Sequence, residues 1–262
     1  MEAMCAEPAI RAFKAAVLEA AEVTVSCRPC DLFRDHPGIA QFTLLDPAAR
    51  TEFHSCRRLT GAAEAMRSGL HPVRHFAQQM QVELQDTRPW IGLDSFDLVR
   101  TQRFNIEALP HPRIAVAAGA AVQSDLWPLQ KWIQLAQVLQ TRLHGAVIQL
   151  GTAEEPVIDD GLSLLGRLSA RETAAVLSRC DLLITTNNGC IDLAAAVQTP
   201  AIVLIAGVEP AARIHAGQTA CSSAAIRNIE DISVDTVVEA IASLSRQALP
   251  DSSTRPIHGD AA

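Results

Sequence analysis

The second half of the chain alternates short, mostly apolar runs with longer segments in which apolar residues recur at helical spacing. The short runs predict strands, and the longer segments predict amphipathic helices. Strands are expected over 114–118, 146–150, 181–185 and 201–205, and helices over 127–143, 170–178, 191–197 and 234–244. Apolar strands that alternate with helices are typical of a parallel sheet covered on both faces, so the pattern predicts a doubly wound α/β fold.

The first half of the chain has a weaker pattern. It predicts a helix over 8–19 with Pro8 in its first turn, strands over 22–26 and 41–45, and a helix over 71–81. Segments 51–69 and 84–105 show no firm periodicity. Two prolines within 108–112 disfavour helix and suit a linker. We therefore expect one domain over 1–110, a second over 113–248, and a disordered tail over 250–262.

Composition and charge exclude several classes of protein. The chain has 262 residues, of which 48% are apolar and 19% charged, so it is not intrinsically disordered. Its net charge of −7 gives no basic surplus and argues against a nucleic-acid binder. No apolar run reaches the roughly 18–20 residues of a transmembrane segment, and residues 1–8 do not resemble a signal peptide. Seven irregularly spaced cysteines favour reduced thiols and a cytoplasmic location.

Two loops at the carboxyl ends of predicted strands could hold a ligand. The first, over 117–121, contains Gly119 and small residues that let a ligand approach the backbone. The second, over 185–189, contains Asn187, Asn188 and Gly189 ahead of a predicted helix, whose free N–H groups suit an anion such as a diphosphate. Each loop, taken alone, is equally compatible with an ordinary tight turn of an α/β domain.

The order of the motifs around these loops is more informative. It runs through Ala118-Gly119-Ala120, Trp127-Pro128, the run Val147-Ile148-Gln149-Leu150-Gly151, Leu165-Gly166-Arg167-Leu168-Ser169, Asn187-Asn188-Gly189-Cys190-Ile191-Asp192 and Thr199-Pro200-Ala201. This series resembles the C-terminal domain of glycosyltransferase family 9, the ADP-heptose:lipopolysaccharide heptosyltransferase family. That family shows Pro-Gly-Ala, Lys-x-Trp-Pro, a strand ending in Gly, Gly-x-(Ser/Thr)-Leu, Asp-(Ser/Thr)-Gly-x-x-His and Gly-x-Pro in the same order. The resemblance covers about residues 113–245.

The resemblance implies a GT-B-like fold, in which two Rossmann-like domains face a cleft. It also implies a metal-independent, cofactor-free transfer with inversion. The donor would be a nucleotide-diphosphate sugar such as ADP-heptose, and the acceptor a glycan or lipid-linked molecule, with peripheral membrane contact. The residues expected to bind the nucleotide sugar are Gly119, Ala120, Asp125, Asn187, Asn188, Gly189 and Asp192.

A fainter resemblance extends to the N-terminus. Residues 7–14 resemble the family's Thr-Pro-Ala-Ile-Arg-Ala-Leu-Lys helix, residues 36–39 its Asn-Pro-x-Ile turn, and residues 71–73 with the following helix a later part of its N-terminal domain. In the family a strand and a Gly-Asp loop precede the first of these helices, and the Asp is the presumed base for the acceptor hydroxyl. Glu2 falls at the position of that Asp, which makes it the candidate catalytic residue. The first strand has no counterpart, so the N-terminal domain is expected to be incomplete.

The sequence departs from the family at its charged positions. The Lys of Lys-x-Trp-Pro is Asp125, and the Asp and His of the later motif are Asn187 and Asp192. A carboxylate beside a phosphate is repulsive, whereas a diphosphate leaving group needs cations and hydrogen-bond donors. Lys131 or Arg213 could compensate. The alternative function is therefore a catalytically inactive GT-B-like binding or scaffold protein, or a truncated gene product.

Two other kinds of site remain open on the sequence. Cys27 and Cys30 have the spacing of a thioredoxin-like redox pair, without a thioredoxin pattern after them. A zinc site could be assembled from Cys27, Cys30, His36, His54 and Cys56, although the spacing is unusual and no metal is expected. Trp127 and Trp132 are expected to pack in the core rather than stack on a base.

Overall fold

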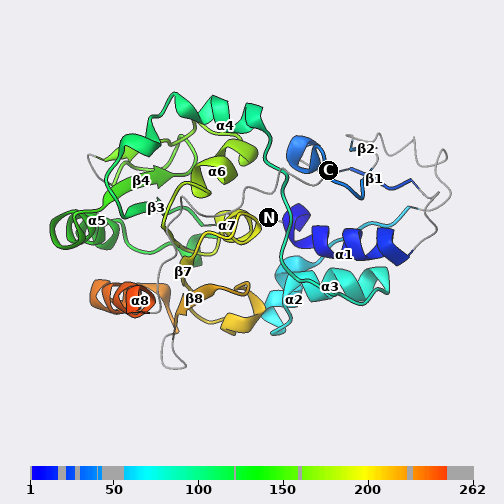
Figure 1. The fold of residues 1–262 in the computed structure, drawn as a ribbon. Coiled ribbons are helices and arrows are strands. Elements are labelled where there is room, and N and C mark those ends of the chain that lie inside the picture. Colours follow the sequence, from blue (N-terminus) through cyan, green and yellow to red (C-terminus); the bar gives the residue numbers. More distant parts are fainter. Residues whose placement is uncertain are drawn as a thin grey trace.

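The computed structural model describes residues 2–16, 22–26, 30–39, 41–42, 56–120, 122–158, 161–222 and 227–246. Its centre is a sheet of six parallel strands in the order β5-β4-β3-β6-β7-β8 (Figure 1). The strands are β3 (Arg113–Ala117), β4 (Ala146–Leu150), β5 (Leu162–Ser163), β6 (Leu182–Thr185), β7 (Ala201–Leu204) and β8 (Gln218–Cys221). The chain starts in the middle of the sheet and runs first to one edge and then to the other, as in a dinucleotide-binding fold.

Helices cover both faces of this sheet. Alternate residues of each strand point to opposite faces. Ile114 and Val116 pack with α5 (Leu129–Leu143) and α8 (Val234–Arg246), whereas Ala115 and Ala117 pack with α6 (Ala170–Leu177) and α7 (Cys190–Ala196). Both sets are fully buried, which explains why the strands are apolar throughout.

The N-terminal part is mostly helical. It contains α1 (Glu2–Ala16), α2 (Ala62–Arg67) and α3 (Pro72–Met80), with a two-stranded parallel sheet of β1 (Thr24–Val25) and β2 (Gln41–Phe42). Helix α1 packs along α3. Short 3-10 turns are η1 (Cys30–Phe33), η3 (Ile106–Ala108), η4 (Gln123–Asp125), η5 (Pro210–Ala212) and η6 (Ile229–Asp231). Helix α4 (Ser95–Gln102) packs on α6 of the sheet, although it precedes the predicted linker.

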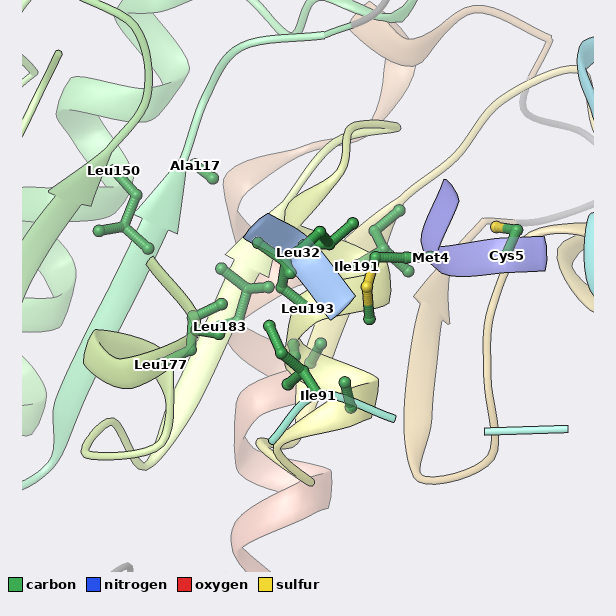
Figure 2. Close-up of a cluster of buried hydrophobic side chains, with 14 of the residues drawn as sticks. Met4, Cys5, Leu32, Ile91, Ala117, Leu150, Leu177, Leu183, Ile191 and Leu193 are labelled. Atoms are coloured by element: carbon green, nitrogen blue, oxygen red, sulfur yellow. The ribbon is translucent and has the colours of Figure 1, made fainter. Parts of the chain in front are cut away.

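One hydrophobic core joins the two parts of the molecule. Met4 of α1 and Leu32 of η1 are buried in the same cluster as Ile191 and Leu193 of α7. Figure 2 shows Met4 beside Ile191, with Leu183 of the sheet beyond them. The first turns of α1 are therefore held against the helix that follows the second candidate loop.

The structure confirms the α/β fold with a parallel sheet, and every helix and strand predicted in the second half is present. Their ends differ by up to two residues; α5, for example, begins at Leu129, because Pro128 occupies its N-cap position. The short strands β5 and β8 were not predicted, since neither has a continuous apolar run.

In the first half, the predicted helix over 8–19 is wrong at its start. Helix α1 begins at Glu2, and Pro8 lies inside it rather than in its first turn. Pro8 provides no N–H for the helical hydrogen bond, but Met4 and Cys5 in the preceding turn are buried against α7, which favours the extended helix. Segments 51–69 and 84–105, which lack periodicity, contain α2 and α4. The predicted tail over 250–262 lies outside the described residues.

No helix in the described ranges is long and apolar enough to cross a membrane. The expected domain boundary near residue 110 stays a prediction.

Candidate functional site

The site lies where the strand order of the sheet reverses. Strands β3 and β6 are neighbours in the centre, and the chain leaves them toward opposite edges. A crevice forms outside the carboxyl ends of the strands at such a point, and ligands of open α/β sheets bind there. The loops that meet at this point are residues 118–120 after β3 and residues 186–189 after β6, which are the two loops singled out on the sequence.

Asn188 fastens the two loops together. Its side-chain Nδ2 donates to the carbonyl oxygens of Ala117 (3.2 Å) and Gly119 (2.6 Å) across the crevice, and its Oδ1 accepts from the backbone N–H of Cys190 (2.9 Å). The Thr186 hydroxyl also donates to the Gly119 carbonyl, at 2.7 Å. These bonds fix the shape of the loops and engage both ends of the Asn188 amide, so this side chain acts as a structural clamp.

A chain of polar contacts runs from the other side of the second loop. Asn187 donates from Nδ2 to Asp125 Oδ2 (2.9 Å) and accepts from Arg213 Nε at Oδ1 (2.6 Å). Arg213 in turn donates from Nη1 to Asp192 Oδ1 (3.0 Å) and from Nη2 to the Asn188 carbonyl (2.7 Å). The guanidinium therefore links the loop after β6 to helix α7.

These residues border a small recess at the carboxyl end of β7. Its lining consists of Asp125, Asn187, Leu204, Ile205, Ala206, Val208, Arg213 and Ile229. The apolar side chains come from β7, the loop after it and η6, so the polar groups lie together on one wall.

Asp192 is completely buried and surrounded by donors. Besides Arg213, it accepts from His215 Nε2 at 2.9 Å and from Cys5 Sγ at 3.3 Å. Burial alone would raise the pKa of the Asp192 carboxyl, but the charge of Arg213 and the His215 hydrogen bond outweigh it and hold that pKa well below the usual range. The carboxylate is therefore ionised. Burial and the nearby Asp192 charge raise the pKa of the Cys5 thiol, so Cys5 stays protonated and can donate.

A second carboxylate, Glu155, lies against two glycines at the ends of β3 and β4. A Cβ atom at Gly119 or at Gly151 would stand 2.5 Å from a Glu155 carboxylate oxygen, so only glycine fits at either position. Glu155 Oε1 accepts from the backbone N–H of Thr152 (2.9 Å), whereas Oε2 is buried without a hydrogen-bond partner in the described structure. A buried, unpartnered carboxylate oxygen is a strong acceptor for a ligand hydroxyl.

Cys190, the first residue of α7, lies close to this carboxylate. Burial raises the pKa of its thiol to about 12, and the negative charges of Glu155 and Asp192 act in the same direction. The thiol is therefore protonated and a poor nucleophile at neutral pH.

The structure brings most of the sequence-predicted residues together. Asp125, Asn187 and Asp192 are linked through Arg213, and Gly119 is linked to Asn188. Ala120 follows Gly119 in its loop, and Gly189 is the N-cap residue of α7.

Two of the charged candidates have different outcomes. Glu2 is the first residue of α1, and its side chain is outside what the structure describes. The prediction that Lys131 could compensate for the lost cations is wrong, because its Nζ donates to the carbonyls of Glu230 and Ile232, on the far side of α5 from the site. Arg213 is near the site, as expected.

Sequence reasoning missed Glu155, His215 and Cys5. Gly151 at the end of a strand, with a carboxylate four residues later, was a local signal for Glu155. Cys5 lies 187 residues from its partner Asp192, so only the folded chain reveals that contact.

The other candidate sites find little support. Cys27 and His54 lie outside the described residues, as does the Cys30 side chain. His36 is buried against Glu7 (2.9 Å), and no group of three potential metal ligands occurs within the described ranges. Trp127 and Trp132 are buried and pack edge to face in the core beside α5, as predicted.

Comparison with known proteins gives the chain a family. The model of glycosyltransferase family 9 (heptosyltransferase) matches residues 71–226, more than half of the chain. Among solved structures, a family 9 glycosyltransferase from Veillonella parvula DSM 2008 superposes with a TM-score of 0.72 at 14% identity, over 94% of each chain. The E. coli ADP-heptose lps heptosyltransferase II gives 0.70 at 14% identity, over 94% of this chain and 96% of that one.

The E. coli heptosyltransferase WaaC, solved with ADP, gives a TM-score of 0.64 at 12% identity over 95% of each chain. No curated protein matches the chain by sequence. At these identities the superpositions establish the fold, and the family match establishes the kinship. The chain belongs to glycosyltransferase family 9.

Proposed function

We propose that this protein transfers a sugar from a nucleotide-diphosphate donor to a glycan or lipopolysaccharide-type acceptor, with inversion at the transferred carbon. The observation that carries the proposal is the meeting of the β3 and β6 loops at the switch point, clamped by Asn188. Family membership supports the reaction class. ADP is the first donor nucleotide to test, because WaaC, which shares the fold, was solved with ADP.

In this proposal the donor lies across the crevice. The backbone of Gly119, Ala120, Asn187 and Gly189 faces the diphosphate, and Asn188 keeps the two loops apart at a fixed distance. The free Oε2 of Glu155 accepts hydrogen bonds from the ribose hydroxyls, as acidic residues do in related nucleotide-binding folds.

For the chemical step, an acceptor hydroxyl attacks the anomeric carbon from the side opposite the nucleotide. The new carbon–oxygen bond forms as the bond to the diphosphate breaks, and the hydroxyl proton passes to a carboxylate base. Glu2 is our candidate for that base. It begins α1, the helix whose next turn puts Cys5 in contact with Asp192 of the donor side.

The proposed setting is the cytoplasm. The described cysteines Cys5, Cys56, Cys180, Cys190 and Cys221 form no disulfides, which fits a reducing compartment. A lipid-linked acceptor would bring the protein to a membrane surface, which it would contact peripherally.

Binding of ADP by the wild-type chain, followed by titration calorimetry, is the first test. We expect a heat of binding, and the variant Asp125→Asn should bind ADP more tightly because it removes a carboxylate from the recess wall. The absence of both binding heat and thermal shift at millimolar ADP would defeat the proposal.

A transfer assay then tests the reaction. ADP-heptose is incubated with a lipopolysaccharide core that lacks heptose, and the acceptor is examined by mass spectrometry for the gain of one heptose. Glu2→Gln should abolish the gain while ADP binding is unchanged. Wild-type protein that binds ADP but transfers no sugar from any nucleotide sugar would instead be the inactive binding protein considered above.

A further inference from the structure

We infer that Arg213 supplies the positive charge that binds the diphosphate of the donor, and that Asp192 and Asn187 position its guanidinium. This inference rests on the proposed function and adds to it the residue that replaces the family's lost cations. In the sequence, Asp125 and Asp192 stand where the resemblance places a Lys and a His. A diphosphate bound between two carboxylates requires a cation from elsewhere in the fold.

Arg213 is the described cation that lines the recess. It shares the recess wall with Asp125 and Asn187, whereas Lys131 is engaged with carbonyl groups at η6. It reaches the site from the loop after β7, next to η5, and not from any position of the family motifs quoted above. An arginine is permanently charged, so the site keeps this charge at any physiological pH.

The guanidinium is held in one orientation from three sides. Nε donates to Asn187 Oδ1, Nη1 to Asp192 Oδ1, and Nη2 to the Asn188 carbonyl with a longer contact to Asp192 Oδ2. Four of its five N–H groups are used in this way, and the fifth, on Nη1, has no partner among the described residues. Such a fixed donor binds an anion with little loss of side-chain freedom.

Asp192 has two opposing effects on a bound diphosphate. It aims Arg213, but it also offsets the charge of the guanidinium from within hydrogen-bonding distance. Replacing the carboxylate with the amide of asparagine keeps a hydrogen-bond acceptor for Arg213 and removes the negative charge. Asp192→Asn should therefore bind ADP more tightly than the wild type, which a purely structural ion pair would not cause.

The experiment compares ADP with adenosine on four proteins by calorimetry: the wild type, Arg213→Lys, Asp192→Asn, and the double variant Asp192→Asn with Arg213→Gln. The double variant removes both buried charges together, so it leaves no unpaired ion in the core. We expect Asp192→Asn to bind ADP several-fold more tightly and the double variant about 10-fold or more weakly than Asp192→Asn. Arg213→Lys should fall below the wild type, because lysine lacks the fork geometry.

Adenosine is the matched control, because it lacks phosphates and reports on the rest of the site. Its affinity should be the same for all four proteins, which also shows that they are folded. The inference is overturned if the double variant binds ADP as tightly as Asp192→Asn, or if Asp192→Asn gains no affinity over the wild type. A wild type that binds adenosine but not ADP overturns it as well, whereas a wild type that binds neither refutes the proposed function itself.

Discussion

At position 192 an ionised carboxylate is completely buried, which is costly unless donors and a cation surround it. Arg213, His215 and Cys5 provide them from three separate segments of the chain. The sequence indicated that position 192 carries the wrong charge for its family. It could not indicate the neutralising partners, because their contact depends on the packing of α1 and the loop after β7 against α7.

His71 is the neighbouring group with the clearest pH response. Its ring packs edge to face on His215 with centroids 4.8 Å apart, and its Nδ1 caps α3 by accepting from the Val73 N–H. Burial, and then the charges of His215 and Arg213, lower its pKa to about 4. In the unfolded chain the pKa is about 6.5. Between these two values the unfolded chain binds a proton that the folded chain does not, so protein stability falls as the pH drops from about 6.5 to about 4.

The variant His71→Asn tests this pH dependence. Asparagine is a good N-cap residue and keeps the cap of α3, but it does not titrate. The wild type should lose up to about 3 kcal/mol of unfolding free energy over this pH range through His71, and the variant should lack that share. Urea unfolding at several pH values measures both. Parallel pH profiles for the two proteins would show that His71 is protonated equally in the folded and unfolded chains.

At the scale of elements, the sheet and its helices were predictable because each strand is buried on both faces and each covering helix shows one apolar stripe. Helix α4 was not. Its exposed face carries Phe96 and Val99, so its apolar residues do not mark the buried side, and its inner face is fixed by ions instead. The buried Asp97 of α4 pairs with the buried Arg171 of α6.

This ion pair predicts that α4 is fastened to α6 mainly through Asp97. Arg171 also donates to the carbonyls of Gly92 and Arg34, so the variant Asp97→Ala leaves a buried guanidinium without its counter-ion and also breaks the capping box of α4. We expect a loss of about 3–5 kcal/mol in unfolding free energy. The measurement is chemical denaturation followed by circular dichroism.

Asp94→Ala is the matched control for Asp97→Ala. Asp94 is the N-cap of the same helix and is half-exposed, so its loss should cost only about 1 kcal/mol. Equal losses for the two variants would mean that the Asp97–Arg171 pair contributes nothing beyond the cap.

For the molecule as a whole, the continuous core from the sheet through α7 to α1 predicts cooperative unfolding. The three tryptophans allow a test, because Trp127 and Trp132 pack beside α5, whereas Trp90 packs against His36 near α1. In Trp90→Phe, fluorescence reports on the sheet side alone, and circular dichroism on the entire chain. The two urea transitions should coincide. A fluorescence transition at higher urea than the dichroism transition would show that the N-terminal part unfolds separately.

The buried pair of Asp192 and Arg213 also constrains the order in which a sequence can change. Either charge alone in this interior would cost several kcal/mol, so a lineage that gains the aspartate first passes through a poorly folded ancestor. An arginine gained first can extend its long side chain into the recess, where its charge remains tolerable. Evolution toward this site is therefore expected to have a preferred direction, with the arginine appearing before the aspartate.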